Sequence, residues 1–201
     1  HAQALMDAAR LALDAVADWI KARRRLPALR TLPPYHDDPA YIGALHADLG
    51  RQIDALDFKP ELLMLSFHGM PERTLLLGDP YHCHCRKTAR LVSERFAATH
   101  PGLRIETTFQ SRFGRAKWLE PATDTVLIAE GQKGTKAIAI AAPGFSADCL
   151  ETLEELSIRG KEDFFEAGGT HFASLTCLND GDEGMGLLET LVRRELAGWW
   201  A

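Results

Sequence analysis

Three carboxylates lie close together in the segment Gly144 to Leu156. Glu151, Glu154 and Glu155 are spaced at i, i+3 and i+4, so in an α-helix they share one stretch of surface. Asp148 precedes Glu151 by three residues and suits a helix N-cap, which would make a capping box of the Asp-x-x-Glu type. The spacing leaves two interpretations open: an acidic, capped helix start, or carboxylates that bind a metal or move protons.

A histidine follows an apolar run in another part of the chain. His68 comes after the expected strand Leu62 to Phe67, and Gly69 and Pro71 then turn the chain. A neutral imidazole can bind Fe(II), and near its ordinary pKa of about 6.5 it can take a proton. Because ligands bind at the carboxyl edge of parallel sheets, we expect His68 and Glu151 to meet there. A hydrogen-bonding, purely structural histidine is the other interpretation.

A long loop from Phe109 to Pro121 follows the next expected strand. It mixes amides, bases and aromatic rings, which offer stacking area and cations to a flat apolar ligand with acidic substituents. An ordinary exposed loop has a similar composition. No glycine-rich phosphate loop occurs at any strand end, which argues against a nucleotide or dinucleotide enzyme.

The tract His82-Cys83-His84-Cys85 contains the residue types that bind zinc. It lacks the separated half-sites of the usual zinc modules, and a helix would turn its two cysteines to different sides. A metal site at this tract is therefore disfavoured.

Four apolar runs alternate with four helical patterns from Leu62 onward. The expected strands are Leu62–Phe67, Leu103–Phe109, Ala137–Ala142 and Phe172–Cys177. The expected helices are Tyr81–Thr99, Ala122–Lys133, Cys149–Ala167 and Glu183–Gly198. Alternation with short links predicts an α/β fold of the doubly wound, Rossmann-type class, with a four-stranded parallel sheet.

The opening residues do not complete such a unit by themselves. The pattern predicts a helix over Ala2–Arg25, a short strand over Leu26–Leu32 and, after an Asp38 cap, a helix to about Leu56. One strand with two helices cannot bury its own faces. We therefore interpret residues 1–57 as the end of a first domain with a linking helix, and residues 58–201 as a second domain.

Composition excludes several classes of protein. The 201 residues are 46% hydrophobic with a net charge of -5, so they present no basic field for nucleic acid. No apolar run approaches the roughly 20 residues needed to cross a bilayer, and the amino-terminal residues do not resemble a signal peptide. We expect a soluble, cytoplasmic protein with reduced thiols at its four cysteines, which are Cys83, Cys85, Cys149 and Cys177.

Several of these segments together resemble the ferrochelatase family, bacterial type, whose members insert ferrous iron into protoporphyrin IX to form protohaem. The matching motifs are SFHGMP (66–71), GDPY (78–81), TTFQSRFG (107–114), WLEP (118–121) and PGFSADCLETLEEL (143–156). They occur in the family's order and at its approximate spacing. Residues 35–42 also resemble the family's linking segment, so the resemblance covers nearly the whole chain and implies a chelatase-like fold.

The resemblance implies a role for individual residues. His68 and Glu151 match a histidine and an acid that face each other across the porphyrin, so they are the expected catalytic and iron-binding residues. Glu155 matches an acid on a path for metal or protons, and Asp148 is assigned to the same path, although it could simply cap the helix. The expected substrate-binding residues are Ser66, Gln110, Trp118 and Phe145.

The chain also departs from the family. Members have two similar domains with the porphyrin cleft between them. This sequence resembles the second domain, but of the first domain it resembles only the end. We therefore expect the 201-residue chain alone to be weakly active or inactive. Some members hold an iron-sulfur cluster through a cysteine-rich tail that this sequence lacks, so we expect no cluster and no required cofactor, with Fe(II) as a substrate.

The expected partners are protoporphyrin IX, ferrous iron and the missing N-terminal domain, without nucleic acid. Peripheral contact with a membrane stays open. Two alternative functions are also consistent with the sequence. One is a cobalt chelatase acting on another tetrapyrrole, and the other is a non-catalytic fragment that binds porphyrin or metal.

Overall fold

The computed structural model describes residues 2–199, with side chains from residue 12 onward. Its contacts divide the chain into two compact units, residues 1–34 and residues 35–201. The first unit contains α1 (Ala2–Lys21), as the helical pattern predicted. The short strand expected at residues 26–32 does not form, because none of the four strands in the sheet pairs with this segment.

The second unit is built on a four-stranded parallel sheet. Its strands are β1 (Leu62–His68), β2 (Arg104–Gln110), β3 (Ala137–Ala141) and β4 (His171–Ser174), in the order β2-β1-β3-β4. All three neighbouring pairs are parallel, which confirms the doubly wound α/β class. The register sets His68 opposite Gln110, so the last residues of β1 and β2 reach the carboxyl edge together.

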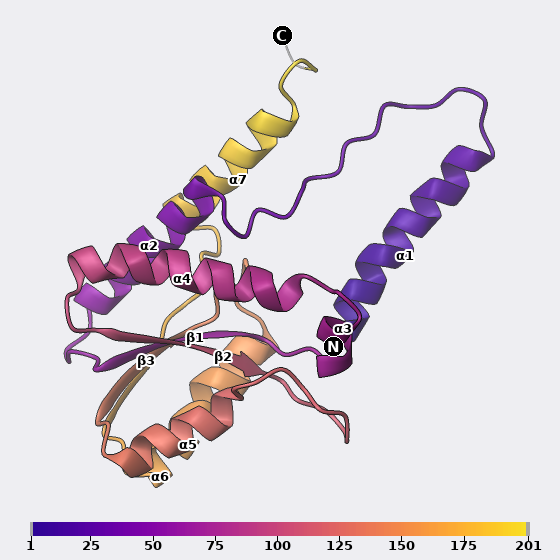
Figure 1. The fold of residues 1–201 in the computed structure, drawn as a ribbon. Coiled ribbons are helices and arrows are strands. Elements are labelled where there is room, and N and C mark those ends of the chain that lie inside the picture. Colours follow the sequence, from indigo (N-terminus) through magenta and orange to yellow (C-terminus); the bar gives the residue numbers. More distant parts are fainter. Residues whose placement is uncertain (1, 200–201) are drawn as a thin grey trace. The chain divides into compact units, whose positions relative to one another are not determined.

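Helices cover both faces of the sheet (Figure 1). One face carries α2 (Pro39–Asp54), α4 (Tyr81–Thr99) and α7 (Asp182–Glu195). The other carries α5 (Thr123–Lys133), η1 (Glu151–Arg159) and α6 (Gly160–Glu166). Since both faces are covered, the central strands β1 and β3 are buried along their whole length, as their continuous apolar runs indicate.

Helix α2 begins as the sequence predicts. The Asp38 side chain accepts a hydrogen bond from the Ala40 N–H at 2.9 Å, and Pro39 occupies the first turn. The Tyr41 hydroxyl donates to the Pro143 carbonyl at 2.5 Å, which ties α2 to the segment after β3. By its contacts α2 belongs with residues 35–201, whereas the sequence interpretation grouped it with the opening residues 1–57.

The helix expected over residues 149–167 has two parts in the structure. Its first part, η1, is a π-helix, in which hydrogen bonds join residues five apart, and α6 continues from it. A short helix that the sequence did not indicate, α3 (Glu72–Leu76), follows β1. None of the helices within residues 2–199 is long and apolar enough to cross a membrane.

Candidate active site

His68 ends β1 at the carboxyl edge of the sheet and is 6% exposed. Its Nδ1 lies 2.8 Å from the Gly69 carbonyl oxygen. A carbonyl oxygen can only accept, so Nδ1 carries the proton and Nε2 keeps its lone pair in the neutral ring. Nε2 is buried and has no hydrogen-bond partner in the structure. Because buried polar atoms are normally paired, this nitrogen is suited to an incoming ligand or proton.

The backbone around His68 is held in place from two sides. The Tyr81 hydroxyl, at the start of α4, donates to the His68 carbonyl at 2.9 Å. Gly69 donates its N–H to the Gln110 carbonyl at 2.7 Å, and a Cβ at Gly69 would stand 2.6 Å from that oxygen. Only glycine permits this close approach. The glycine directly after His68 therefore helps to fix the position of the imidazole.

Two aromatic residues of the expected porphyrin cleft lie near this end of β1. The Phe145 ring centroid is 6.1 Å from that of His68, because the turn at Pro143 and Gly144 ends β3 at the same edge. Trp118 pairs through its backbone with Pro71, three residues after His68. The histidine therefore has one ring beside it and a second on the loop after β2, which pairs with the loop that follows β1.

Ser66 and Gln110 form a buried chain of hydrogen bonds. The Ser66 hydroxyl donates to Gln110 Oε1 at 2.9 Å, and Gln110 Nε2 donates to the Glu151 carbonyl at 3.2 Å. Both side chains are nearly inaccessible, at 0% and 2% exposure. These hydrogen bonds connect β1 through β2 to the first residue of η1, so they bring the backbone of Glu151 to the edge where His68 lies. In this geometry both residues support the site from within the protein.

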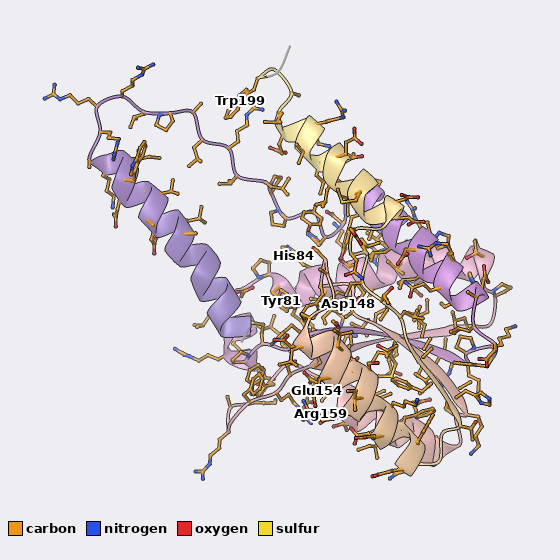
Figure 2. The ribbon with its side chains drawn as sticks, turned by 180° about the vertical axis from the view of Figure 1, so that it is seen from behind. Tyr81, His84, Asp148, Glu154, Arg159 and Trp199 are labelled. Carbon is orange, nitrogen blue, oxygen red and sulfur yellow. The ribbon has the colours of Figure 1, made fainter. Side chains whose placement is uncertain are left out.

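Two of the three acids of η1 have different partners. Because the helix is of the π type, Glu154 pairs with Arg159, five residues on, at 2.8 Å (Figure 2). Glu155 instead bonds Ser111, whose N–H donates to Glu155 Oε1 at 2.6 Å and whose hydroxyl donates to Oε2. The sequence spacing predicted three acids on neighbouring surface, and in the structure Glu154 and Glu155 have different hydrogen-bond partners.

Ser111 is a site residue that the sequence interpretation did not single out. It follows β2 directly, is 4% exposed and adopts a φ of 63°, in the left-handed region that non-glycine residues rarely occupy. This conformation turns both its N–H and its hydroxyl toward Glu155. A polar residue straight after a buried strand was the available signal.

Asp148 does not form the expected capping box. The residue at the N-cap of η1 is Leu150, which makes no side-chain cap. Asp148 accepts hydrogen bonds from the Thr152 hydroxyl, the Cys177 N–H and the Asn179 amide instead. Burial favours the neutral acid, but these bonds outweigh burial and hold the pKa of Asp148 below its usual range.

Two adjoining cavities lie beside η1, of about 380 Å³ and about 310 Å³, and Glu155 and Asp124 border both. The first is also lined by Gln110, Ser111 and Trp118. A larger cavity of about 470 Å³ lies at the opposite, amino edge of the sheet, between Pro60 and Leu103. The pair beside η1 is bordered by the candidate residues Gln110, Trp118 and Glu155, whereas His68, Glu151 and Phe145 do not line either cavity.

The His-Cys tract does not gather into a metal site. The His84 ring stacks on His36 at 3.7 Å, and the His82 ring faces Phe109 at 5.5 Å, so the two imidazoles have separate partners. Cys83 is exposed, and all four cysteines are free thiols. Across the part of the chain that the structure describes, no three His, Cys, Asp or Glu side chains group closely enough to hold a metal.

Comparison with known proteins assigns the family. A family model described as Ferrochelatase matches residues 3–196. The chain is 51% identical over 186 residues to a ferrochelatase of Rhizobium meliloti, covering 92% of this chain and 54% of the relative. It is 49% identical over 186 residues to the ferrochelatase of Agrobacterium fabrum, with the same coverages, and 48% identical over 176 residues to that of Mesorhizobium japonicum, covering 88% and 49%. The chain spans about half the length of these curated relatives, and it belongs to the ferrochelatase family.

Proposed function

We propose that the protein inserts ferrous iron into protoporphyrin IX to form protohaem, as a ferrochelatase of haem biosynthesis. The observation that carries this proposal is the buried, unpartnered Nε2 of His68, which lies beside Phe145 at the carboxyl edge of the sheet. The chain supplies one side of the porphyrin cleft. The other side comes from the half of the protein that the relatives have in addition, which acts as this chain's partner.

The reaction requires two pyrrole N–H protons to leave as Fe(II) enters the ring, so the total charge is conserved. A planar macrocycle shields its nitrogen lone pairs, and apolar walls that hold it in a distorted shape expose them. Phe145 and Trp118 provide such walls in this chain. The lone pair of His68 Nε2 then either accepts a pyrrole proton or coordinates the arriving iron.

Glu151 and Glu155 supply negative charge to the site. Carboxylates attract a divalent cation and balance its charge while its ligands exchange. Ser111 orients the Glu155 carboxylate, and Gln110 fixes the backbone of Glu151. The two acids therefore stand on one helix as a route for iron toward the ring or for protons away from it.

No resident cofactor is required in this proposal, since iron and porphyrin are the substrates and an iron-sulfur cluster has no part. A cytoplasmic location is proposed with it, on the composition of the chain and its free thiols.

The test is a metallation assay under anaerobic conditions, followed by porphyrin absorbance and fluorescence. Two proteins are compared: this chain, and a chimera in which it replaces the matching segment of the Rhizobium meliloti ferrochelatase. We expect the chimera to insert Fe(II) into protoporphyrin IX and the chain alone to insert little. Porphyrin binding without metallation by the chimera would support a non-catalytic binding protein. Cobalt insertion into a reduced tetrapyrrole, with no iron insertion, would support a cobalt chelatase.

A further inference from the structure

Asn179 lies in the connection between β4 and α7 and makes three hydrogen bonds to the loop that joins β3 to η1. Its N–H donates to the Ser146 carbonyl at 3.0 Å, its Oδ1 accepts from the Asp148 N–H at 2.8 Å, and its Nδ2 donates to Asp148 Oδ2 at 2.7 Å. Its φ of 48° lies in the left-handed region, which asparagine tolerates better than most residues. Through these bonds Asn179 holds the loop in place.

The carboxylate of Asp148 is fully engaged with protein donors. Oδ2 accepts from Asn179, while Oδ1 accepts from the Thr152 hydroxyl at 3.0 Å and from the Cys177 N–H at 3.3 Å. Thr152 is the second residue of η1 and directly follows Glu151. Asp148 thus links Asn179 to the helix that carries the site's acids.

The loop that Asn179 holds carries a candidate site residue on either side of Asp148. Phe145, beside His68, stands three residues before Asp148, and Glu151 stands three residues after it. We propose that Asn179 is a positioning residue that sets Phe145 and Glu151 against His68, and that Asp148 is its structural partner and carries neither protons nor metal. This inference rests on the proposed function, and it reassigns Asp148 from the path that the family resemblance implied.

Burial and hydrogen bonding support this assignment of Asp148. Its oxygens have three protein donors, so a proton or a cation would have to displace a bond that holds the loop. The same bonds keep the pKa of Asp148 below its usual range, despite the opposing effect of burial, so the group stays ionised at neutral pH. A proton carrier needs a pKa near the working pH.

The pair can be tested by exchanging its two side chains. Asp148→Asn with Asn179→Asp reverses the donor and acceptor between the side chains and leaves the net charge unchanged. The Asn at position 148 can still accept from Thr152 and Cys177, and the Asp at position 179 can still accept from the backbone N–H of residue 148. Asn179→Asp alone sets two carboxylates against each other, and Asp148→Asn alone sets two amide donors against each other.

Two measurements are made on the wild type, both single variants and the exchanged pair. One is the kcat and KM of iron insertion in the chimera, and the other is amide hydrogen exchange of residues 145–152 in the chain. We expect Asn179→Asp to lower kcat by about 10- to 100-fold, with the porphyrin KM within about twofold of the wild type. The amide of Asp148 should exchange faster in both single variants, and the exchanged pair should restore kcat and protection together.

Two results would overturn the inference. An exchanged pair that regains protection but not turnover would show that a carboxylate at position 148 is itself needed for the chemistry. Unchanged kcat and unchanged protection in Asn179→Asp would show that Asn179 does not position Phe145 and Glu151. A wild-type chimera that inserts no iron would contradict the proposed function instead, and the exchange measurements would still decide whether Asn179 holds the loop.

Discussion

The Nδ1 of His68 donates at 2.8 Å to the carbonyl of Gly69, the first residue after β1. This bond fixes the tautomer of the ring and leaves the lone pair of Nε2 buried and without a partner. Ligating histidines commonly donate their second nitrogen to a backbone carbonyl, and the arrangement suits a metal ligand as well as a base. The chemistry of the site is therefore set by local backbone geometry at the end of β1.

Gly69→Ala should disturb this geometry. The added Cβ would stand 2.6 Å from the Gln110 carbonyl oxygen, so β1 and β2 must separate at their carboxyl ends. We expect a loss of about 1 to 3 kcal/mol in the free energy of unfolding, measured by urea denaturation, together with slower iron insertion. The matched control is Gly186→Ala in α7, where an added Cβ has open space, and it should stabilise the protein by about 0.5 to 1 kcal/mol. Equal effects of the two substitutions would contradict the close approach at Gly69.

The acids of η1 should differ in their contribution to turnover. We expect Glu151→Gln and Glu155→Gln each to lower iron insertion at least about tenfold, since each removes a charge near the iron route. Glu154→Gln should stay within about twofold of the wild type, because Glu154 is paired with Arg159 on a solvated surface. Initial rates against Fe(II) concentration measure this. A loss in Glu154→Gln as large as in the other two would mean that the ion pair with Arg159 does not keep Glu154 out of the reaction.

Ser111→Ala should weaken the site through Glu155. The substitution removes the hydroxyl that donates to Glu155 Oε2 and keeps the backbone N–H that donates to Oε1. A hydrogen bond to a charged group of this kind predicts a loss of about tenfold in the iron-insertion rate at low Fe(II). Ser157→Ala, on η1 itself, is the control and should leave the rate unchanged. A full rate in Ser111→Ala would indicate that Glu155 needs no orientation.

Glu130 should make the stability of the fold depend on acid pH. Burial disfavours its charged form, but bonds from Arg104, Lys133 and Thr135 outweigh burial and lower the pKa of Glu130 from 4.5 to about 2. The unfolded chain therefore binds this proton first, so the stabilisation is complete above pH 4.5 and is lost as the pH falls toward 2.

The size of this effect follows from the shift in pKa. It amounts to about 3 kcal/mol at neutral pH, and Glu130→Gln should remove most of it. Urea unfolding of Glu130→Gln between pH 2 and 7 should show a shallower pH dependence than the wild type. Glu120→Gln, at an exposed position, should keep the wild-type slope. If the free energy of unfolding of Glu130→Gln and of the wild type changed with pH in parallel, Glu130 would not be the source of this pH dependence.

The sheet and its chemistry-bearing edge could be predicted from local sequence patterns. The run Ala137–Ala142 is apolar without a break, which is typical of a strand buried on both faces, and β3 forms there. Because parallel strands end at one edge, His68 and Glu151 were expected to meet there. In the structure His68 lies opposite Gln110, whose amide donates to the Glu151 carbonyl at 3.2 Å.

The details that depend on distant residues could not be predicted. The Asp148 side chain bonds Asn179, 31 residues away, and Glu155 bonds Ser111, 44 residues away, so neither contact has a local signal. The π-helical form of η1 also escaped prediction, since spacing at i, i+3 and i+4 suits an α-helix. In the π-helix, Glu154 pairs with Arg159 five residues on.

In the proposed reaction, metallation depends on the free lone pair of His68 Nε2. The most direct measurement is the rate of Fe(II) insertion into protoporphyrin IX by the chimera with His68→Ala, with folding checked by circular dichroism. His171→Ala, at an exposed histidine at the start of β4, is the matched control. We expect a loss of about 100-fold or more for His68→Ala and a wild-type rate for His171→Ala. A folded His68→Ala chimera that keeps the wild-type rate would contradict this proposal.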